Sequence, residues 1–354
     1  MQAERSTHRI AQVLPAHTPD LFRSAVRQAA DRLNAGDVVA LPTETVYGLA
    51  ANALDAEAVA GIYRAKGRPA HNPIIVHVAS LDMARACVTA WPEAAARLAA
   101  AFWPGPLTLV LSRSEKVPGI VTAGGPTVGI RWPSHPLIQA VIRKCNFPLA
   151  APSANLSNRI SPTSAEHVLE QLGDRIPLIV DGGASAVGIE STVLDLTVDP
   201  PRVLRPGMIH EPALAAVLGN LRHVELGERA TCNLQPATLR SPGLLAKHYA
   251  PRARLVILRW RNDADLERLA EGLRLAPGDT HVLAHHRIPG AGRWREVSVI
   301  PHDPEAFARA LYAELHRCDA AGAQNIVVES VPDGPEWAGL ADRLRRAASP
   351  GAGD

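Results

Sequence analysis

Helix-like and strand-like patterns alternate through the N-terminal part of the chain, and this alternation constrains the fold more than any other feature. Residues 20–34 carry apolar side chains at helical spacing, and residues 55–66 predict a second helix that Asp55 caps. Short apolar runs between such helices, for example VVALPT at 38–43 and PIIVHVA at 73–79, are typical of buried strands. We therefore expect an α/β domain built on a mixed, twisted sheet.

The length of 354 residues exceeds the size at which single cores usually stop growing, so we expect two domains. Residues 254–345 again alternate strand and helix patterns, which predicts a small, Rossmann-like α/β domain without the glycine fingerprint of a dinucleotide site. The turn-rich stretch before it shows no sustained period. We place the first domain at 18–210, a linker at 211–251 and the second domain at 252–347.

Composition narrows the class of protein. A net charge of +2 is too small to indicate nucleic-acid or membrane binding by bulk electrostatics, and 4% aromatic residues argue against a base-stacking RNA surface. The four cysteines lie far apart and show neither disulfide nor zinc spacing. The polar N-terminus and the absence of a long apolar run predict a cytoplasmic protein without a membrane span.

A cluster of cations marks the end of the second predicted helix. Arg64, Lys66 and Arg68 fall within five residues, just before Pro69 and Pro73. Three solvated side chains at a helix C-terminus are the simplest interpretation. Spacing of i, i+2 and i+4 cannot put all three on one solvated face unless the chain bends, however, and the prolines could supply that bend. The cluster is therefore also a candidate anion site.

Other polar side chains follow or interrupt predicted strands. Thr43, Glu44 and Thr45 come after the strand that Pro42 ends, where α/β sheets often present ligands, although a capped turn explains them equally well. His77 alternates with valines and so faces away from them, into a polar cleft or, more commonly, a satisfied core position. Arg131 lies in a predicted strand and needs an anion, either from the protein or from a ligand.

Donors recur farther along the chain. The loop APSANLSNRISPTS at 151–164 is rich in serine and asparagine, Ser191 precedes a strand, and Arg205 ends one. Such a loop can satisfy its own turns or donate to phosphate oxygens. Together these donors and cations suit a polyanionic ligand such as a nucleoside triphosphate. No GxxxxGK[ST] loop is present, so such a site would differ from a P-loop.

Seven runs carry a resemblance in this order and spacing: PTETVYGLA, KGRPAHNPIIVHV, FWPGPLTLVL, VGIRWPSHP, APSANLSNRISPTSAEHV, GIESTVLDL and VLRPGMI. They resemble the YrdC-like family of threonylcarbamoyl-AMP synthases. SPGLLAKHYAP followed by a small α/β domain is similar to the long, two-domain form. The resemblance implies a twisted sheet with a concave basic cavity, and a linker that closes over the active site.

The resemblance also implies an activity. Enzymes of this family, a type of nucleotidyltransferase, condense L-threonine, bicarbonate or CO2, and ATP into threonylcarbamoyl-adenylate and pyrophosphate, and Mg2+ accompanies the ATP. A separate tRNA threonylcarbamoyl transferase complex then modifies the adenosine next to the anticodon. Direct tRNA binding by the synthase would be weak or indirect.

Carried over by position, the resemblance implies two sets of residues. The threonine set comprises Thr45, His77, Arg131, the backbone near Ala151, and Ser191. The ATP set comprises Lys66, Arg68, Asn72, Thr127, Ser153, Asn155, Ser161, Arg205 and Tyr249. Within the second set, Lys66 and Arg68 would be catalytic because they would clamp the triphosphate. No residue is predicted to ligate a metal directly.

Two other functions compete with this one. The first is a non-catalytic RNA-binding or ribosome-maturation protein that would use the basic concave surface. The second is a carbamoyl-transfer module such as those of hydrogenase-maturation enzymes, which would carry zinc-finger segments, and no CxxC pair is present in this chain. Pyrophosphate release that depends on threonine and bicarbonate, and not on added tRNA, distinguishes the synthase from the RNA-binding protein.

Overall fold

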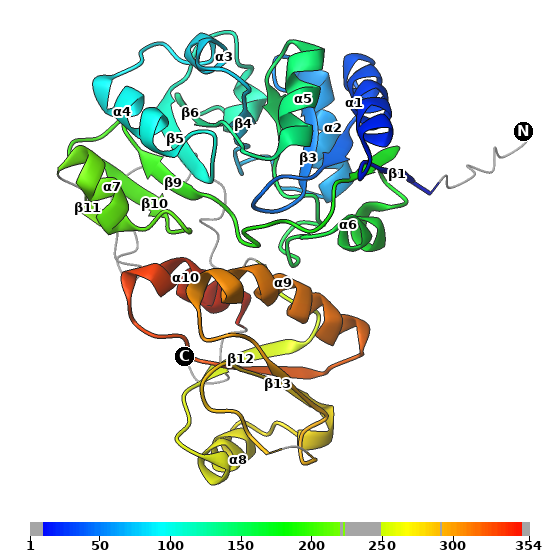
Figure 1. Ribbon diagram of the computed structural model, residues 1–354, viewed down its shortest axis with the longest axis vertical. Coiled ribbons are helices and arrows are strands. Elements are labelled where there is room, and N and C mark those ends of the chain that lie inside the picture. The colour runs from blue at the N-terminus through cyan, green and yellow to red at the C-terminus, as the bar shows by residue number, and fades with distance from the viewer. Residues whose placement is uncertain (1–9, 220–221, 224–248, 291, 349–354) are drawn as a thin grey trace, which may run out of the picture.

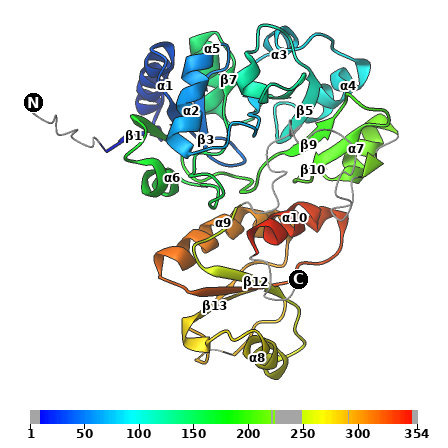
Figure 2. The ribbon, with the colours of Figure 1, turned by 180° about the vertical axis from the view of Figure 1, so that it is seen from behind.

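Two α/β units make up the computed structural model, which describes residues 10–219, 222–223, 249–290 and 292–348. The larger unit lies above the smaller one in Figure 1, and both views show helices of the smaller unit facing the larger one (Figure 2). The predicted fold class, a mixed α/β fold with a second, smaller α/β domain, is confirmed. Of the predicted linker, residues 220–221 and 224–248 lie outside the described residues.

The larger unit is built on a mixed sheet whose strand order is β1-β8-β2-β3-β7-β4-β6-β5-β9-β10-β11. Its strands are β1 (Gln12–Pro15), β2 (Val39–Leu41), β3 (Gly48–Asn52), β4 (Val76–His77), β5 (Leu107–Ser112), β6 (Thr127–Arg131), β7 (Leu149–Ala150), β8 (Leu178–Asp181), β9 (Thr192–Asp195), β10 (Arg202–Arg205) and β11 (Arg222–His223). Its helices are α1 (Pro19–Asn34), α2 (Ala56–Lys66), α3 (Leu81–Ala86), α4 (Glu93–Phe102), η1 (Gly119–Thr122), α5 (Pro136–Cys145), α6 (Ala165–Leu172) and α7 (Glu211–Leu218).

Helices cover both faces of this sheet because its strands are apolar on both faces. In β2, Val39 and Leu41 pack in the core under α1 and α5, whereas Ala40 packs in the core on the other face. This is the alternation expected of a strand buried on both faces. Strands β4 and β7 have only two residues each, and both lie fully buried near the middle of the sheet.

The smaller unit holds a parallel sheet in the order β12-β15-β13-β14. Its elements are β12 (Arg254–Leu258), α8 (Asp263–Gly272), η2 (Pro277–Asp279), β13 (Thr280–Ala284), β14 (Glu296–Val299), α9 (Pro304–Ala320), β15 (Asn325–Glu329), η3 (Pro335–Trp337) and α10 (Ala338–Ala347). One apolar core joins α9 and α10 to Val46, Ile160 and Ile189 of the larger unit. The two units are thus packed together through a shared core.

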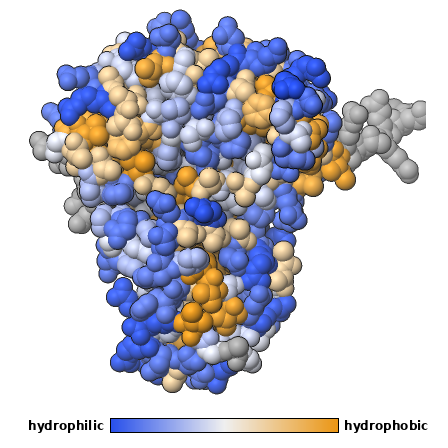
Figure 3. All heavy atoms as spheres, in the orientation of Figure 1, coloured by the Kyte–Doolittle hydropathy of each residue, from blue (hydrophilic) through white to orange (hydrophobic). Residues whose placement is uncertain are grey.

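Most predicted elements are present, and the exceptions are short or lie at an edge. The sequence did not predict β1, β3, β11, β14 or α3, of which β1, β11 and β14 lie at edges of their sheets in the described part of the chain. On the face drawn in Figure 3, hydrophilic residues dominate the surface, with an apolar patch in the middle of the smaller unit. None of the helices in the described ranges has the length and apolarity that crossing a membrane requires.

Candidate functional site

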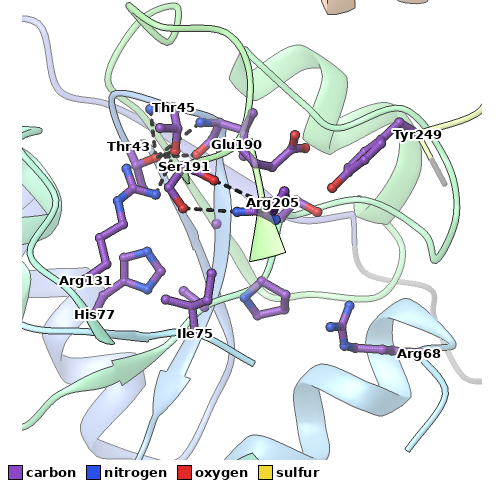
Figure 4. A pocket seen from close by; sticks show the side chains of 15 residues that line it. Thr43, Thr45, Arg68, Ile75, His77, Arg131, Glu190, Ser191, Arg205 and Tyr249 are labelled. Atoms are coloured by element: carbon purple, nitrogen blue, oxygen red, sulfur yellow. Dashed lines mark hydrogen bonds between the residues drawn. The ribbon is translucent and has the colours of Figure 1, made fainter. Parts of the chain in front are cut away.

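A pocket opens where loops from the middle of the large sheet meet the smaller unit (Figure 4). A volume of about 50 Å³ within it is accessible to the centres of water molecules. The lining residues are Thr43, Thr45, Val46, Gly48, Arg68, Ile75, His77, Arg131, Ala151, Pro152, Ser153, Glu190, Ser191, Arg205 and Tyr249.

Hydroxyl groups on the turn after β2 form one side of the pocket. Pro42 follows the strand, and the Thr43 hydroxyl donates to the Val46 carbonyl at 2.6 Å, which closes the turn. Thr43 and Thr45 also join their hydroxyls at 2.9 Å. Both side chains are buried, so the turn is rigid and presents Thr45 to Arg131, whose Nη1 donates to its hydroxyl at 2.9 Å.

Arg131 holds the charge on this side of the pocket. It ends β6, is 4% exposed, and its Nη2 lies 2.8 Å from Glu44 Oε1. The sequence required an anion for this arginine, and a protein carboxylate supplies one. Burial alone would raise the pKa of Glu44, but the nearby charge of Arg131 and its hydrogen bond lower that pKa below its usual value.

His77 lies beside Arg131 in Figure 4 and is neutral. Burial, together with the positive charge of Arg131, lowers the pKa of His77 to about 3. Its Nδ1 has no hydrogen-bond partner in the part of the chain that the structure describes. A ligand can therefore form a hydrogen bond with this nitrogen without displacing a partner within the described residues.

Two further arginines lie on the other side of the pocket, near Tyr249 (Figure 4). Arg205 ends β10, and it donates from Nε to the Ser191 carbonyl at 3.0 Å and from Nη2 to the Ser191 hydroxyl at 3.0 Å. Arg68 donates to the carbonyls of Asn72 and Pro73. Burial lowers the pKa of Arg68 to about 10, so it remains a cation at neutral pH.

The cation cluster of the sequence divides into three different roles. Gly67, with φ of 59°, ends α2 and turns the chain, so the bend begins before the prolines. Arg68 then reaches the pocket. Lys66 lies behind it, with Nζ donating to the Ser153 carbonyl and to both oxygens of Asn155. Arg64 is an exposed surface residue paired with Glu57, so for it the simplest interpretation was right.

Of the predicted site residues, nine line the pocket and five do not. The nine are Thr45, Arg68, His77, Arg131, Ala151, Ser153, Ser191, Arg205 and Tyr249. The other five are not part of the lining. Lys66 donates to the Ser153 carbonyl and to Asn155, the carbonyl of buried Asn72 accepts from Arg68, and Ser161 donates to Glu190. Thr127 begins β6, at the end opposite Arg131. Their roles stay predictions.

Sequence reasoning missed one lining carboxylate and the residues that hold it. Glu190 accepts from Ser161, from Tyr312 on α9 and from Arg343 on α10. Glu190 stands between Ile189 and Ser191, just before a predicted strand, and this position could have indicated a buried carboxylate. Nothing in the sequence of α10 distinguishes Arg343 from the arginines around it, because its depth depends on how the two units pack.

The described residues contain no group of His, Cys, Asp and Glu suited to hold a metal ion. The lining carboxylate Glu190 is paired with Arg343, and Glu44, which lies behind the lining, is paired with Arg131. The site thus fits anions and not a resident cation. Fold and pocket define a two-unit α/β protein with a buried, arginine-lined site for anionic ligands.

Comparisons with known proteins give the family. The chain belongs to the Sua5/YciO/YrdC family, whose model, described as "Telomere recombination", matches residues 31–207. A second model, the C-terminal domain of threonylcarbamoyl-AMP synthase, matches residues 209–349. The family predicted from the sequence motifs is confirmed.

Two curated relatives and one solved structure show how far the similarity extends. Threonylcarbamoyl-AMP synthase of Pyrococcus abyssi is 39% identical, over 91% of this chain and 94% of its own length. The Bacillus subtilis protein of that name is 41% identical, over 91% and 92%. The structure of P. abyssi Sua5 complexed with L-threonine has a TM-score of 0.85 and 38% identity, covering 96% of this chain and 97% of its own. The predicted enzyme class, a nucleotidyltransferase, is confirmed by these names.

Proposed function

We propose that the protein is an L-threonylcarbamoyladenylate synthase, which condenses L-threonine, bicarbonate or CO2, and ATP. The observation that carries the proposal is the pairing of two differently equipped halves in one buried pocket. Thr45, Arg131 and His77 form the half suited to an amino acid, and Arg68 and Arg205 form the half suited to phosphates. The relative solved with L-threonine supports threonine as a substrate.

In the amino-acid half, Arg131 would bind the threonine carboxylate through its guanidinium, and Thr45 would orient it. Neutral His77 would accept a hydrogen bond from the threonine amine. Ala151 and Ser191 would complete this half, since both line the pocket. Such contacts place the amine toward the phosphate half, where it can react.

The reaction would need positioning more than acid–base catalysis. The amine adds to CO2 and loses a proton, the carbamate oxygen then attacks the α-phosphorus of ATP, and the bond from that phosphorus to the bridging oxygen breaks so that pyrophosphate leaves. Arg68 and Arg205 would offset the repulsion between these anions. If bicarbonate is the species captured, it takes up a proton and releases water to give CO2 before the amine adds.

The remaining ATP contacts are proposals of the same kind. Lys66 and Asn155 would fix the loop that presents Ser153, and Asn72, Thr127, Ser161 and Tyr249 would contact ATP. Mg2+ would arrive with ATP as the counter-ion of its phosphates, since no resident cation site exists in the described ranges. Residues 18–210 would form the catalytic domain, 211–251 the linker, and 252–347 the second domain.

The product would serve tRNA modification next to the anticodon, because an acyl-adenylate is an activated group that another enzyme must accept. A tRNA threonylcarbamoyl transferase complex is the expected acceptor, and the synthase itself would contact tRNA weakly or indirectly. The cytoplasmic location stays a prediction.

The test is pyrophosphate release by the purified protein together with transfer of label from ¹³C-bicarbonate into a threonine- and adenylate-containing product. We expect both to require threonine, bicarbonate and ATP and to be unaffected by added tRNA. A protein that binds RNA without releasing pyrophosphate would instead support the non-catalytic alternative and overturn the proposal.

A further inference from the structure

The smaller unit reaches the pocket through one carboxylate. Glu190 lines the pocket at the segment before β9, and both of its oxygens accept hydrogen bonds. Oε1 accepts from the Ser161 hydroxyl at 2.5 Å, within the larger unit, and lies 3.4 Å from the Tyr312 hydroxyl of the smaller unit. Oε2 accepts from Arg343 Nε at 2.7 Å and from the Tyr312 hydroxyl at 3.1 Å, both in the smaller unit. Glu190 thus connects α9 and α10 to the loop that carries Ser161.

Arg343 is built into this position and is completely buried. Besides Glu190 Oε2, it donates from Nη2 to the Glu190 carbonyl at 3.1 Å and from Nη1 to the Pro206 carbonyl at 2.8 Å. Nη1 also pairs with Asp342 Oδ2 at 2.7 Å, and Arg346 pairs with the other oxygen of Asp342 at 2.9 Å. Its guanidinium carbon lies 5.5 Å from the centre of the Tyr249 ring. These contacts hold Arg343 against the segment that precedes β9 and the segment that follows β10, next to Arg205.

A contact between two glycines allows α10 to come this close. A Cβ on Gly339 would lie 3.0 Å from the Gly207 Cα, so the two backbones touch. Gly339 is four residues before Arg343 and therefore lies on the same face of the helix. The close approach puts the guanidinium within reach of Glu190, and a longer side chain at Gly339 would hold it away.

The pairing of Arg343 with Glu190 matters because Glu190 carries a negative charge. A carboxylate that faces a pocket for phosphates repels the ligand unless a cation neutralises it. Burial tends to raise the pKa of Glu190, but the charges of Arg343 and Arg205 lower that pKa below its usual value, so the group is ionised. If Arg205 alone had to neutralise Glu190, little of its charge would remain for phosphate.

We propose that Arg343, from the C-terminal domain, is a positioning residue of the ATP site: it neutralises Glu190 and thereby leaves Arg205 and Arg68 available for the phosphates. The proposal rests on the proposed function, because it concerns ATP. It gives the C-terminal domain a direct part in nucleotide binding without contact between that domain and the nucleotide. Threonine, bound in the other half of the pocket, should be largely unaffected.

The experiment measures binding of a non-hydrolysable ATP analogue and, separately, of threonine by calorimetry on the full chain. Arg343→Met should weaken the analogue at least tenfold and threonine by less than about threefold. Glu190→Gln in the same chain should restore analogue binding to within about threefold of the parent protein, because it removes the carboxylate that Arg343 neutralised. Structural damage alone would not be repaired by this second change.

Two further variants control for charge and for folding. Arg345→Met removes the same charge from an exposed position two residues away on α10, and its analogue affinity should stay within about twofold. Arg343→Lys keeps the charge and covers the case in which the methionine variant does not fold. It should bind the analogue within about fivefold of the parent.

Three results would overturn the proposal: unchanged analogue affinity in a folded Arg343→Met chain, equal loss for threonine and analogue, or no recovery on adding Glu190→Gln. A tenfold loss in a folded Arg343→Lys chain would do the same. If the parent protein itself does not bind the analogue, the failure lies with the proposed function instead.

Discussion

Among single residues, Arg131 explains best why this pocket suits an amino acid. It is nearly inaccessible to solvent, yet it faces Thr45, Glu44 and His77 and not the apolar core. A buried guanidinium is retained only where its charge is neutralised and its donors are used. Glu44 provides the charge, and a ligand carboxylate can share the donors.

The first prediction concerns this residue. Arg131→Met should reduce kcat/KM for threonine at least a hundredfold, about 3 kcal/mol, because the substrate loses its carboxylate partner and Glu44 stays buried without a cation. Affinity for an ATP analogue should change by less than threefold. Pyrophosphate-release kinetics and calorimetry measure the two effects.

The control for this prediction is Arg143→Met, which removes an exposed arginine of α5 and should leave the kinetics unchanged. Threonine turnover close to that of the parent in a folded Arg131→Met protein would contradict the assignment.

The second prediction separates Lys66 from Arg68. Lys66→Met leaves three oxygens of the Ser153–Asn155 loop, two buried and one half-buried, without their donor, so both the free energy of unfolding and turnover should fall, the former by about 2–4 kcal/mol. Arg68→Met should lower turnover strongly and the free energy of unfolding by at least 1 kcal/mol less than Lys66→Met. Urea unfolding and pyrophosphate release measure both. Equal losses of stability would show that the two cations have one common role.

At the level of helices and strands, the sequence predicted what depends on local pattern. Helix α2 is an example, because its N-cap Asp55, its apolar face and its C-cap Gly67 all lie within one continuous segment. β3 was missed because GLAAN has neither β-branched residues nor alternation, and only its pairing with β2 and β7 makes it a strand. In the same way, the sequence motifs indicated Arg131 and Arg205, but not the pairing of Glu190 with Arg343.

The third prediction concerns the contact between Gly188, in the loop before β9, and helix α9. Gly188 has φ of 88°, and a Cβ there would lie 2.3 Å from the Ala308 carbonyl oxygen. Gly188→Ala should therefore reduce the free energy of unfolding by about 3 kcal/mol or more, because it adds overpacking to backbone strain.

Gly183→Ala is its matched control. Gly183 has φ of 87° with nothing within 4 Å of the added Cβ, so only the strain of about 1–2 kcal/mol should remain. Urea unfolding of both variants measures the difference. Similar losses in the two would mean that α9 does not hold this loop closely.

In the whole molecule, the two units behave as parts of one site. The core between them includes Tyr249 and Tyr312, and α9 and α10 supply partners to the loops that line the pocket. The stacked pair His167 and His316 adds a contact that depends on pH, with ring centres 3.8 Å apart and His316 Nε2 3.2 Å from the Ser161 carbonyl oxygen. Packing between units is therefore part of how the pocket is shaped.

The fourth prediction follows from this pair. Burial, with the charge of His167, lowers the pKa of His316 to about 3, and burial also lowers the pKa of His167. The unfolded chain then binds more protons than the folded one below about pH 6.5, so the free energy of unfolding should fall as pH drops from 6.5 toward 4. His316→Gln should reduce this slope by up to about 1.4 kcal/mol per pH unit.

Urea unfolding at several pH values measures the slope. Exposed His71 provides the control, since His71→Gln should leave the slope of the parent protein. If the slope of the His316→Gln protein also matched that of the parent, the buried histidine pair would not be a source of acid sensitivity.

The most direct test of the account is a crystal structure of the full chain with threonine and a non-hydrolysable ATP analogue bound together. We predict the threonine carboxylate on the Arg131 guanidinium, the amine beside His77, and the phosphates on Arg68 and Arg205, with Glu190 still held by Arg343. Threonine and phosphates bound at separate sites, away from Arg131, Arg68 and Arg205, would contradict the claim that one buried pocket brings the two substrates together.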